Sequence, residues 1–282
     1  MVERIDQWSL GPPVLVDAHA HMHNRFDPAT FFAAAETNFR QAAATLGTDG
    51  SALGLLVLTV GENEWPWHRL ASLDVGHDSA AWACLETREE LSLLVERAGK
   101  IRLILVAGRQ LRTAEALEVL ALGCDRDLPE GRPLGETLLA VRDCGALPVV
   151  PWGFGKWWGR RGRLLASLLD TEPPASFFLG DNGGRPSSFP RPDTFERARC
   201  LGIRDLPGSD PLPFAGEVSR AGSRGFVLPT PLDRDTPAAG LLSRLRDPGF
   251  HPATYGPGER LLPFTVKQVG MQLRKLGRRA GS

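Results

Sequence analysis

The chain has few histidines and cysteines and no excess of charge of either sign. Its 33 basic residues equal its 33 acidic residues, so the net charge predicts no general attraction to nucleic acid or to an acidic membrane. No apolar run reaches the length of a membrane span, and the polar first residues show no secretory signal. The cysteines form no CxxC motif, which argues against a zinc knuckle and predicts reduced thiols in a cytoplasmic protein. They are Cys84, Cys124, Cys144 and Cys200.

Three of the six histidines lie within five residues, directly after an apolar segment. Residues 14–18 have the composition of a short buried strand, and His19, His21 and His23 follow it. Side chains two residues apart in an extended segment point the same way, so His19 and His21 can bind one cation. His23 either joins them or turns outward, and Asp17 is placed to accept a ring N–H. A loop with three polar residues is the alternative interpretation.

Apolar strands alternate with helical segments over most of the chain. This order predicts an α/β fold, a distorted β/α barrel with a β-rich insertion or hairpin around residues 82–122. We expect one domain over residues 1–282 that ends in a basic helix at about 262–282. Strands are expected near 14–18, 53–60, 101–108, 146–150, 176–179, 203–206 and 226–228, and helices near 28–46, 133–143, 164–169, 193–200 and 237–246.

Glycine-rich segments with a few polar groups follow the predicted strands, and functional groups gather at such carboxyl ends in α/β folds. Lys156 lies at one strand exit, beside a predicted helix whose free N–H groups favour an anion. A tryptophan pair packed under solvated arginines is the alternative there. Asp181 and Arg185 flank a second exit, where a tight turn is the alternative.

Other titratable residues have weaker patterns. Glu62 follows the strand 53–60 and is a reserve candidate for an acid or a base. Glu115 and Glu118 are expected to be a solvated pair. The isolated histidines are expected to be surface or core residues. They are His68, His77 and His251.

The motif DAHAH after the first strand and the motif GSD near the last strands resemble the PHP family of metal-dependent phosphoesterases. The same start and late aspartate also occur in the amidohydrolase superfamily, including the TatD-like hydrolases. The resemblance covers about residues 14–230 and implies a distorted β/α barrel of PHP or TIM type. The chain departs from the family pattern at four places. These are Gln110 for the Glu of a GxE turn, Leu120 for a His, Pro151-Trp152 for a His-Pro pair, and Asp210-Pro211-Leu212 for an Asp-x-His motif.

The resemblance therefore implies a metal-dependent hydrolase, most simply a phosphoesterase, with a degenerate ligand set. His19, His21 and Asp210 would hold one divalent Zn, Mn or Fe ion, with Gln110 as a weak fourth ligand. Asp210 or Asp181 would take the proton from the attacking water. A small anion such as a phosphoester would be the substrate, and neither nucleic acid nor a membrane is an expected partner. The predicted substrate-binding residues are Lys156, Arg185, Trp152 and Asn182.

The alternative is a barrel that has lost too many ligands for chemistry and binds an anion or a protein partner. The oligomeric state is not predicted.

Overall fold

The computed structural model describes residues 13–48, 52–75, 81–173, 176–259, 261, 264–267 and 269–271. Its strands are β1 (Val14–Ala20), β2 (Leu53–Val60), β3 (Asp74–Val75), β4 (Trp82–Glu86), β5 (Ser92–Arg97), β6 (Lys100–Arg112), β7 (Glu118–Leu122), β8 (Leu147–Pro151), β9 (Phe178–Asn182), β10 (Asp205–Gly208), β11 (Gly225–Leu228) and β12 (Ala253–Tyr255). Its helices are α1 (Pro28–Thr45), α2 (Trp67–Leu70), α3 (Leu134–Asp143), α4 (Gly159–Thr171), α5 (Asp193–Cys200) and α6 (Pro237–Arg246), with a 3-10 helix η1 (Ala215–Arg220).

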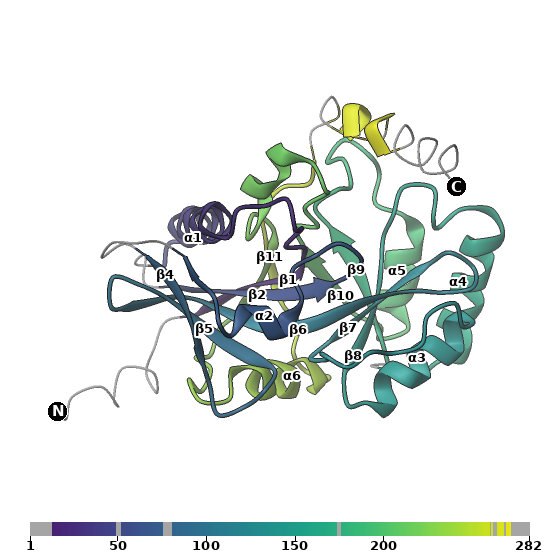
Figure 1. The fold of residues 1–282 in the computed structure, drawn as a ribbon. Coiled ribbons are helices and arrows are strands. Elements are labelled where there is room, and N and C mark those ends of the chain that lie inside the picture. Colours follow the sequence, from purple (N-terminus) through teal and green to yellow (C-terminus); the bar gives the residue numbers. More distant parts are fainter. Residues whose placement is uncertain are drawn as a thin grey trace.

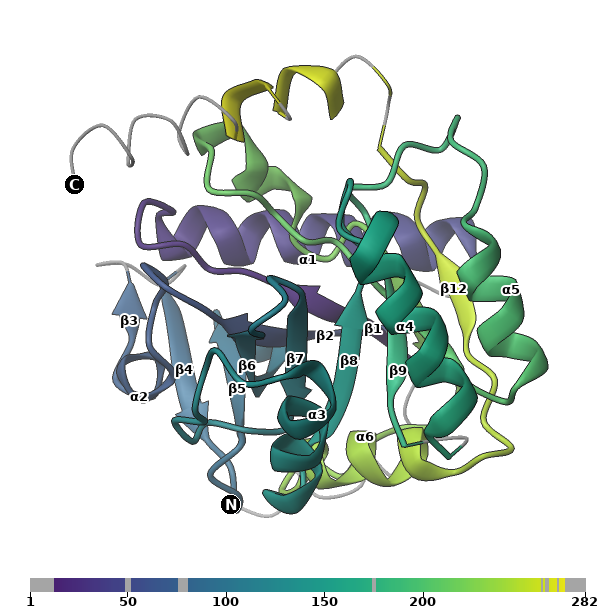
Figure 2. The ribbon, with the colours of Figure 1, turned by 90° about the vertical axis from the view of Figure 1, so that its right-hand side faces the viewer.

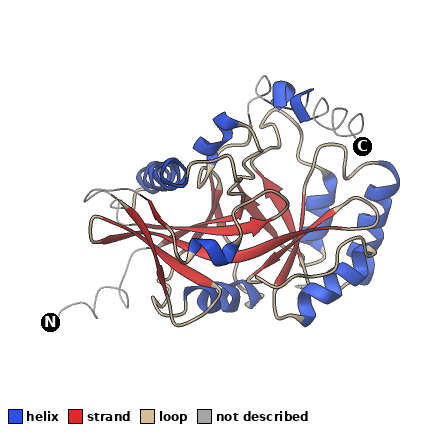
Figure 3. Cartoon of the chain, viewed as in Figure 1, coloured by secondary structure: helices blue, strands red, loops and turns tan. Residues whose placement is uncertain are grey.

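The described strands form one mixed sheet with helices on its outside (Figures 1 and 3). Their order along the sheet is β10-β9-β8-β7-β6-β2-β1-β11-β12, and β3, β4 and β5 branch from β6. The expected α/β barrel is therefore present in a coarse form, as a barrel-like sheet that is nearly closed.

The sheet curls until β10 lies beside β1. The Asp210 N–H donates to the His19 carbonyl at 2.8 Å, and the Ser209 N–H donates to the Asp17 carboxylate at 2.9 Å. A Cβ atom at Gly208 would lie 2.5 Å from the His19 backbone nitrogen, so a residue with a side chain would push β10 away from β1. This close approach brings the early metal-ligand candidate His19 next to the late candidate Asp210.

The direction of the strands decides which residues share one end of the barrel. β1, β2 and β6 are parallel, β8, β9 and β10 are parallel, and β7 is antiparallel to both of its neighbours. The carboxyl ends of six strands and the beginning of β7 therefore meet at the same end. This reversal is not part of a TIM barrel, where all strands run in parallel.

The β-rich insertion is smaller than predicted. β6 and β7 are strands of the barrel-like sheet, and only β3, β4 and β5 of the region 82–122 and its flank lie outside that path. The sequence pattern could not separate them, because strands within an antiparallel meander have the same apolar composition on and off the barrel path.

Three apolar layers hold the elements. The first lies between the sheet and α1, which begins at Asp27, whose side chain accepts the Thr30 N–H at 2.8 Å. The second fills the inside of the sheet and includes the apolar face of α6. The third packs α3, α4 and α5 against the outer face of β7, β8 and β9.

The helix α6 lies at the end of the barrel opposite to the carboxyl ends of β8 and β9 (Figure 2). Arg204, which precedes β10, donates to the carbonyls of Leu245, Asp247 and Phe250 at the carboxyl end of α6. α6 therefore covers one end of the barrel, and we expect a functional site at the other end, where the carboxyl ends of β8 and β9 lie.

Two predictions lie mostly or wholly outside the described residues. The basic C-terminal helix was predicted at about 262–282, and residues 264–267 and 269–271 are helical. His77 is not among the described residues. No helix in the described part of the chain is both long and apolar enough to cross a membrane. That the chain is one cytoplasmic domain stays a prediction.

We predict that Asp17→Ala lowers the free energy of unfolding by about 3 kcal/mol or more. The Asp17 carboxylate is fully buried and accepts from the Ser209 N–H, the Ser209 hydroxyl, the Gly222 N–H and the His19 N–H. Each buried donor left without an acceptor costs about 1–3 kcal/mol. Urea unfolding followed by circular dichroism measures the loss.

The control for this prediction is Asp27→Ala, which removes an exposed helix cap and costs about 1 kcal/mol. Equal losses in the two variants would contradict the bridging role of Asp17.

Candidate metal centre

His19, His21 and Asp210 converge at the open end of the barrel. His19 Nε2 lies 2.8 Å from His21 Nε2, and the Asp210 Oδ1 atom lies 3.7 Å from the first and 3.6 Å from the second. They form the group of metal-ligating side chains found among the described residues. Both histidines are buried, and the Asp210 side chain is 18% exposed.

The spacing of these three atoms fits a metal ion. A circle through them has a radius of about 2.0 Å, and bonds from zinc to nitrogen and oxygen are about 2.0–2.2 Å long. Two imidazoles and one carboxylate are ligands that Zn, Mn and Fe accept, and they leave positions open for water or substrate. The site can therefore hold one divalent ion.

The backbone around Asp210 is held in an unusual conformation. Asp210 has a φ of 48°, in the left-handed region, which aspartate tolerates better than most residues. Its N–H is fixed by the His19 carbonyl, and its Oδ2 atom accepts from the Asn182 amide at 2.6 Å. The second N–H bond of the same amide goes to the Trp152 carbonyl at 2.8 Å. Asn182 thus orients Asp210 so that Oδ1 faces the histidines.

A carboxylate that sequence reasoning missed lies behind His21. The two oxygens of Glu64 are 3.0 and 3.1 Å from His21 Nδ1, and one is 3.2 Å from His23 Nδ1. The Glu64 side chain is 5% exposed. The reserve candidate Glu62 lies two residues earlier and is exposed. The signal in the sequence was the polar exit of β2, but the turn at Asn63, with a φ of 60°, decides which glutamate points inward.

The surroundings of the site shift the pKa values of His19 and His21 in opposite directions. Burial lowers the pKa of His19 to about 4. Burial also acts to lower the pKa of His21, but the Glu64 carboxylate, with Asp210 and Glu118, outweighs it and raises this pKa to about 9. Burial acts to raise the pKa of Asp210, but electrostatic interactions with His19, His21 and Lys156 outweigh it and lower this pKa. Asp210 is therefore ionised and ready to be a ligand.

Positive side chains surround Asp210. Lys156 and Arg220 both act on its pKa. Lys156 forms an ion pair with Glu118, the first residue of β7. Glu118 was expected to be a solvated residue, but its charge reaches both His19 and His21. It lies at the site because β7 runs opposite to its neighbours, which no local pattern in the sequence indicates.

Asp181 and Arg185 form an ion pair with each other and do not flank the site as separate groups. The Arg185 guanidinium donates to Asp181 at 2.9 and 3.2 Å, and Arg224 donates to the same carboxylate at 2.7 Å. Burial acts to raise the pKa of Asp181, but these two arginines outweigh it and lower the pKa. A carboxylate held by two guanidinium groups is a poor proton acceptor, so this geometry does not favour Asp181 as a base.

The other predicted residues lie in different places. Gln110 lies beside His19 and acts on its pKa. The Trp152 ring is buried in the layer under α4, and only its carbonyl reaches Asn182. Asp17 binds backbone N–H groups and the Ser209 hydroxyl and does not touch a histidine ring, which corrects the expectation that it fixes a tautomer.

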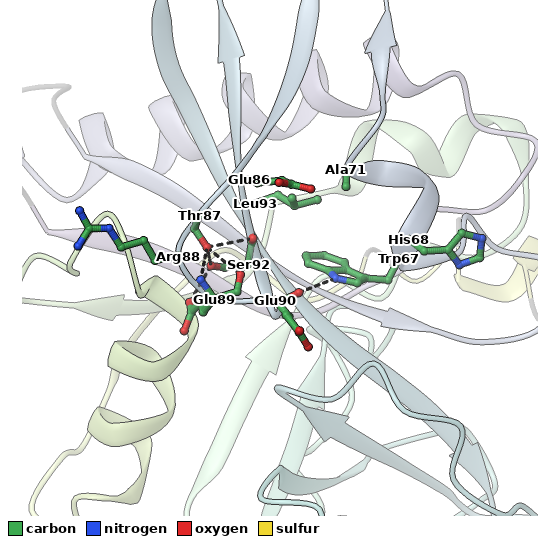
Figure 4. A pocket seen from close by; sticks show the side chains of 10 residues that line it. All are labelled: Trp67, His68, Ala71, Glu86, Thr87, Arg88, Glu89, Glu90, Ser92 and Leu93. Carbon is green, nitrogen blue, oxygen red and sulfur yellow. Dashed lines mark hydrogen bonds between the residues drawn. The ribbon is translucent and has the colours of Figure 1, made fainter.

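A pocket of about 290 Å³ lies elsewhere, between α2 and the β4–β5 hairpin (Figure 4). Several of its polar groups have structural partners. The Trp67 indole donates to the Glu90 carbonyl at 3.0 Å, and the Glu89 carboxylate accepts from the Ala238 and Ala239 N–H groups at the start of α6. None of the three candidate ligands lines it.

Comparison with known proteins gives a fold and no family. No protein-family model matches the chain, and a search of curated proteins found no match. Among solved structures, PsfC from Pseudomonas syringae PB-5123 aligns over 94% of this chain and 99% of its own, with 17% identity and a TM-score of 0.53. The chain shares the fold of PsfC. At this identity the likeness concerns the fold alone.

Two endonuclease structures align with lower scores. The lesion-specific endonuclease PfuEndoQ from Pyrococcus furiosus has 13% identity and a TM-score of 0.49, over 86% of this chain and 57% of its own. Endonuclease Q in complex with a 27-mer duplex substrate has 14% identity and a TM-score of 0.48, over 87% of this chain and 60% of its own.

These two structures correct the expectation that no nucleic acid is a partner. That expectation depended on the zero net charge, and zero net charge does not exclude nucleic acid when structural neighbours include endonucleases, one of them bound to a duplex. TM-scores below 0.5 assign no substrate to this chain. Nucleic acid is therefore no longer excluded as a partner, but it is not assigned as one either.

The Asp181 ion pairs generate a prediction about pH. The folded pKa of Asp181 lies below the ordinary value of 3.8, so its ion pairs contribute stability above that pH and lose it as the pH falls further. We expect Asp181→Asn to lower the free energy of unfolding by about 3 kcal/mol at neutral pH, the usual cost of breaking a buried pair. Urea unfolding should show a constant deficit from about pH 8 to pH 5 that narrows only in acid below 3.8.

The matched control is Asp170→Asn, which removes an exposed partner of Arg197. A deficit for Asp181→Asn that is independent of pH down to the acid limit would contradict the ion-pair origin of the effect.

Proposed function

We propose that this chain is a metal-dependent hydrolase of PHP-like type whose substrate is an anionic ester, most simply a phosphoester. The observation that carries the proposal is the convergence of His19 Nε2, His21 Nε2 and Asp210 Oδ1 around one point at metal-ligand distance. The order of the motifs and the nearly closed barrel-like sheet support it.

In this proposal His19, His21 and Asp210 hold one divalent ion, and Gln110 lies near enough to His19 to act on its pKa and is the candidate fourth ligand. Such an ion supplies Lewis-acid activation of the ester and of a water molecule. The protein supplies the rest. Asn182 holds Asp210 in its orientation, and the buried surroundings of the histidines strengthen every charge in the site.

Lys156 is the residue that we propose for binding the anion. Its charge acts on Asp210, so it lies within electrostatic reach of the candidate metal. Its ion pair with Glu118 keeps the ammonium group at the site end of β7 in the absence of substrate. Asp181 and Arg185 are left out of the chemistry, because each already binds the other.

The second candidate function is a barrel that binds an anion without turning it over. The departures Gln110 and Leu120 favour it, because each replaces an ionisable ligand of the PHP pattern with a neutral residue. Metal binding without turnover of any phosphoester would support this candidate over the hydrolase.

The test of the proposal is the metal content of the purified protein, measured by inductively coupled plasma mass spectrometry. We expect about one Zn, Mn or Fe per chain in the wild type, and loss of this metal together with phosphoesterase turnover in the double variant His19→Ala/His21→Ala and in Asp210→Asn, because each removes a ligand.

His251→Ala is the matched control, since His251 is exposed and is not part of the group of candidate ligands. Equal metal content in the wild type and the double variant would sink the proposal.

We further expect Lys156→Met to raise the KM for an anionic phosphoester about 10–100-fold, because a hydrogen bond to a charged group is worth about 1.5–3 kcal/mol. Steady-state kinetics with the metal-loaded protein measure this effect. The exposed neighbour Arg160, changed to Gln, is the control and should leave KM unchanged. A fall in metal content in Lys156→Met would show that the residue supports the metal and does not bind the substrate.

A further inference from the structure

The Glu64 carboxylate is a buried acidic group in contact with the candidate metal centre, and the proposed function assigns it no role. It follows β2 and is held by the Gly61 N–H, which donates to one of its oxygens at 3.0 Å. Both of its oxygens face the Nδ1 atom of His21, and one of them also faces Nδ1 of His23. A carboxylate with this many donors has no freedom to turn toward a substrate.

The contact with His21 decides which nitrogen of that ring is available. An ionised carboxylate only accepts hydrogen bonds, so the hydrogen between Glu64 and His21 belongs to Nδ1. When the Nε2 proton is lost, as metal binding requires, the Nε2 atom offers its lone pair. This Nε2 atom is the one that lies 2.8 Å from His19 and 3.6 Å from Asp210. Glu64 therefore selects the tautomer that a metal ligand requires.

The contact with His23 reaches the other side of the site. His23 Nδ1 faces Glu64 at 3.2 Å, and its Nε2 atom lies 2.9 Å from the carbonyl of Pro211. Pro211 directly follows Asp210. His23 thus turns away from the metal position and lies between Glu64 and the loop of Asp210. Both neighbours are hydrogen-bond acceptors, so the single N–H of a neutral His23 ring donates to one of them. Glu64 therefore contacts one candidate ligand directly, and it also contacts the histidine that lies against the loop of another.

We propose that Glu64 is the positioning residue of this metal centre, which holds His21 as the Nδ1–H tautomer. The inference rests on the proposed function, because it assigns Glu64 a role toward the same metal. Carboxylates that bind a metal-ligating histidine from behind typically change metal affinity 10–100-fold when they are removed.

The experiment compares the zinc affinity of the wild type, Glu64→Gln and Glu62→Gln by competition with a chromophoric chelator. We expect the dissociation constant of Glu64→Gln to rise about 10–100-fold, and that of Glu62→Gln to stay at the wild-type value. Glu62 is the matched control, because it lies on the same turn and is exposed. Glutamine keeps the size of the side chain, so a gain in Kd reports the lost charge and not a cavity.

A second measurement reads the tautomer directly. In the zinc-loaded wild type with nitrogen-15-labelled histidine, long-range nuclear magnetic resonance spectra should show the His21 hydrogen on Nδ1 and the metal-bound nitrogen as Nε2. Zinc on Nε2 leaves the ring hydrogen on Nδ1 in any case, so the exchange of this hydrogen with solvent is the readout that reports Glu64. In Glu64→Gln the Nδ1 hydrogen should exchange faster with solvent.

The outcomes separate this inference from the proposed function. Zinc binding by the wild type with an unchanged Kd in Glu64→Gln overturns the role of Glu64 and leaves the hydrolase standing. A His21 hydrogen on Nε2 in the zinc-loaded wild type overturns it as well, even where Glu64→Gln fails to fold. Absence of zinc binding in the wild type overturns both.

Discussion

The site depends on one buried carboxylate, that of Asp17. It accepts from Ser209 beyond the end of β10 and from Gly222 beyond η1, and so fastens a late part of the chain to β1. Burial without a counter-charge raises the pKa of Asp17 to about 6, against the hydrogen bonds that favour the ionised form. Burying this carboxylate costs free energy of folding. In return it holds β10 against β1, and only in that arrangement are residues 19 and 210 neighbours.

The candidate centre is built in layers around that closure. The inner layer is the triangle of His19, His21 and Asp210. Asn182 on one side and Glu64 on the other fix how the inner groups point. The positive charges of Lys156 and Arg220 then favour the ionised form of Asp210.

Much of the fold could be predicted from the sequence. The strand 53–60 and the helices 193–200 and 237–246 were predicted with the bounds that the structure gives, because apolar runs and helical periodicity are local signals. The sequence could not predict the direction of β7 or the place of β6 in the barrel path, because strand pairing is decided by contacts between distant residues.

The residues of the candidate site likewise fall into those that local sequence patterns predicted and those that they did not. The clustered pair His19 and His21 was visible because both ligands lie on one strand exit. Glu64 and Glu118 were missed or misassigned, because a positive φ at Asn63 and a reversed strand place them, and neither leaves a mark in composition. Strand order predicted that Asp181 and Arg185 flank the mouth, but it could not predict their mutual ion pair, which is decided by side-chain packing.

The reversal of β7 also gives the barrel an adaptable rim. The residues 113–117 that join β6 to β7 form a tight turn at the same end as the metal-ligand candidates, with Thr113 and Leu117 joined by a backbone hydrogen bond of 2.9 Å. Parallel neighbours are joined by a crossover of about a dozen residues or more, usually with a helix, whereas a hairpin can lengthen or shorten at its tip while the ladder below keeps its register. Changes of length in this turn would therefore reshape the mouth, and with it the range of ligands admitted, at little cost to the barrel.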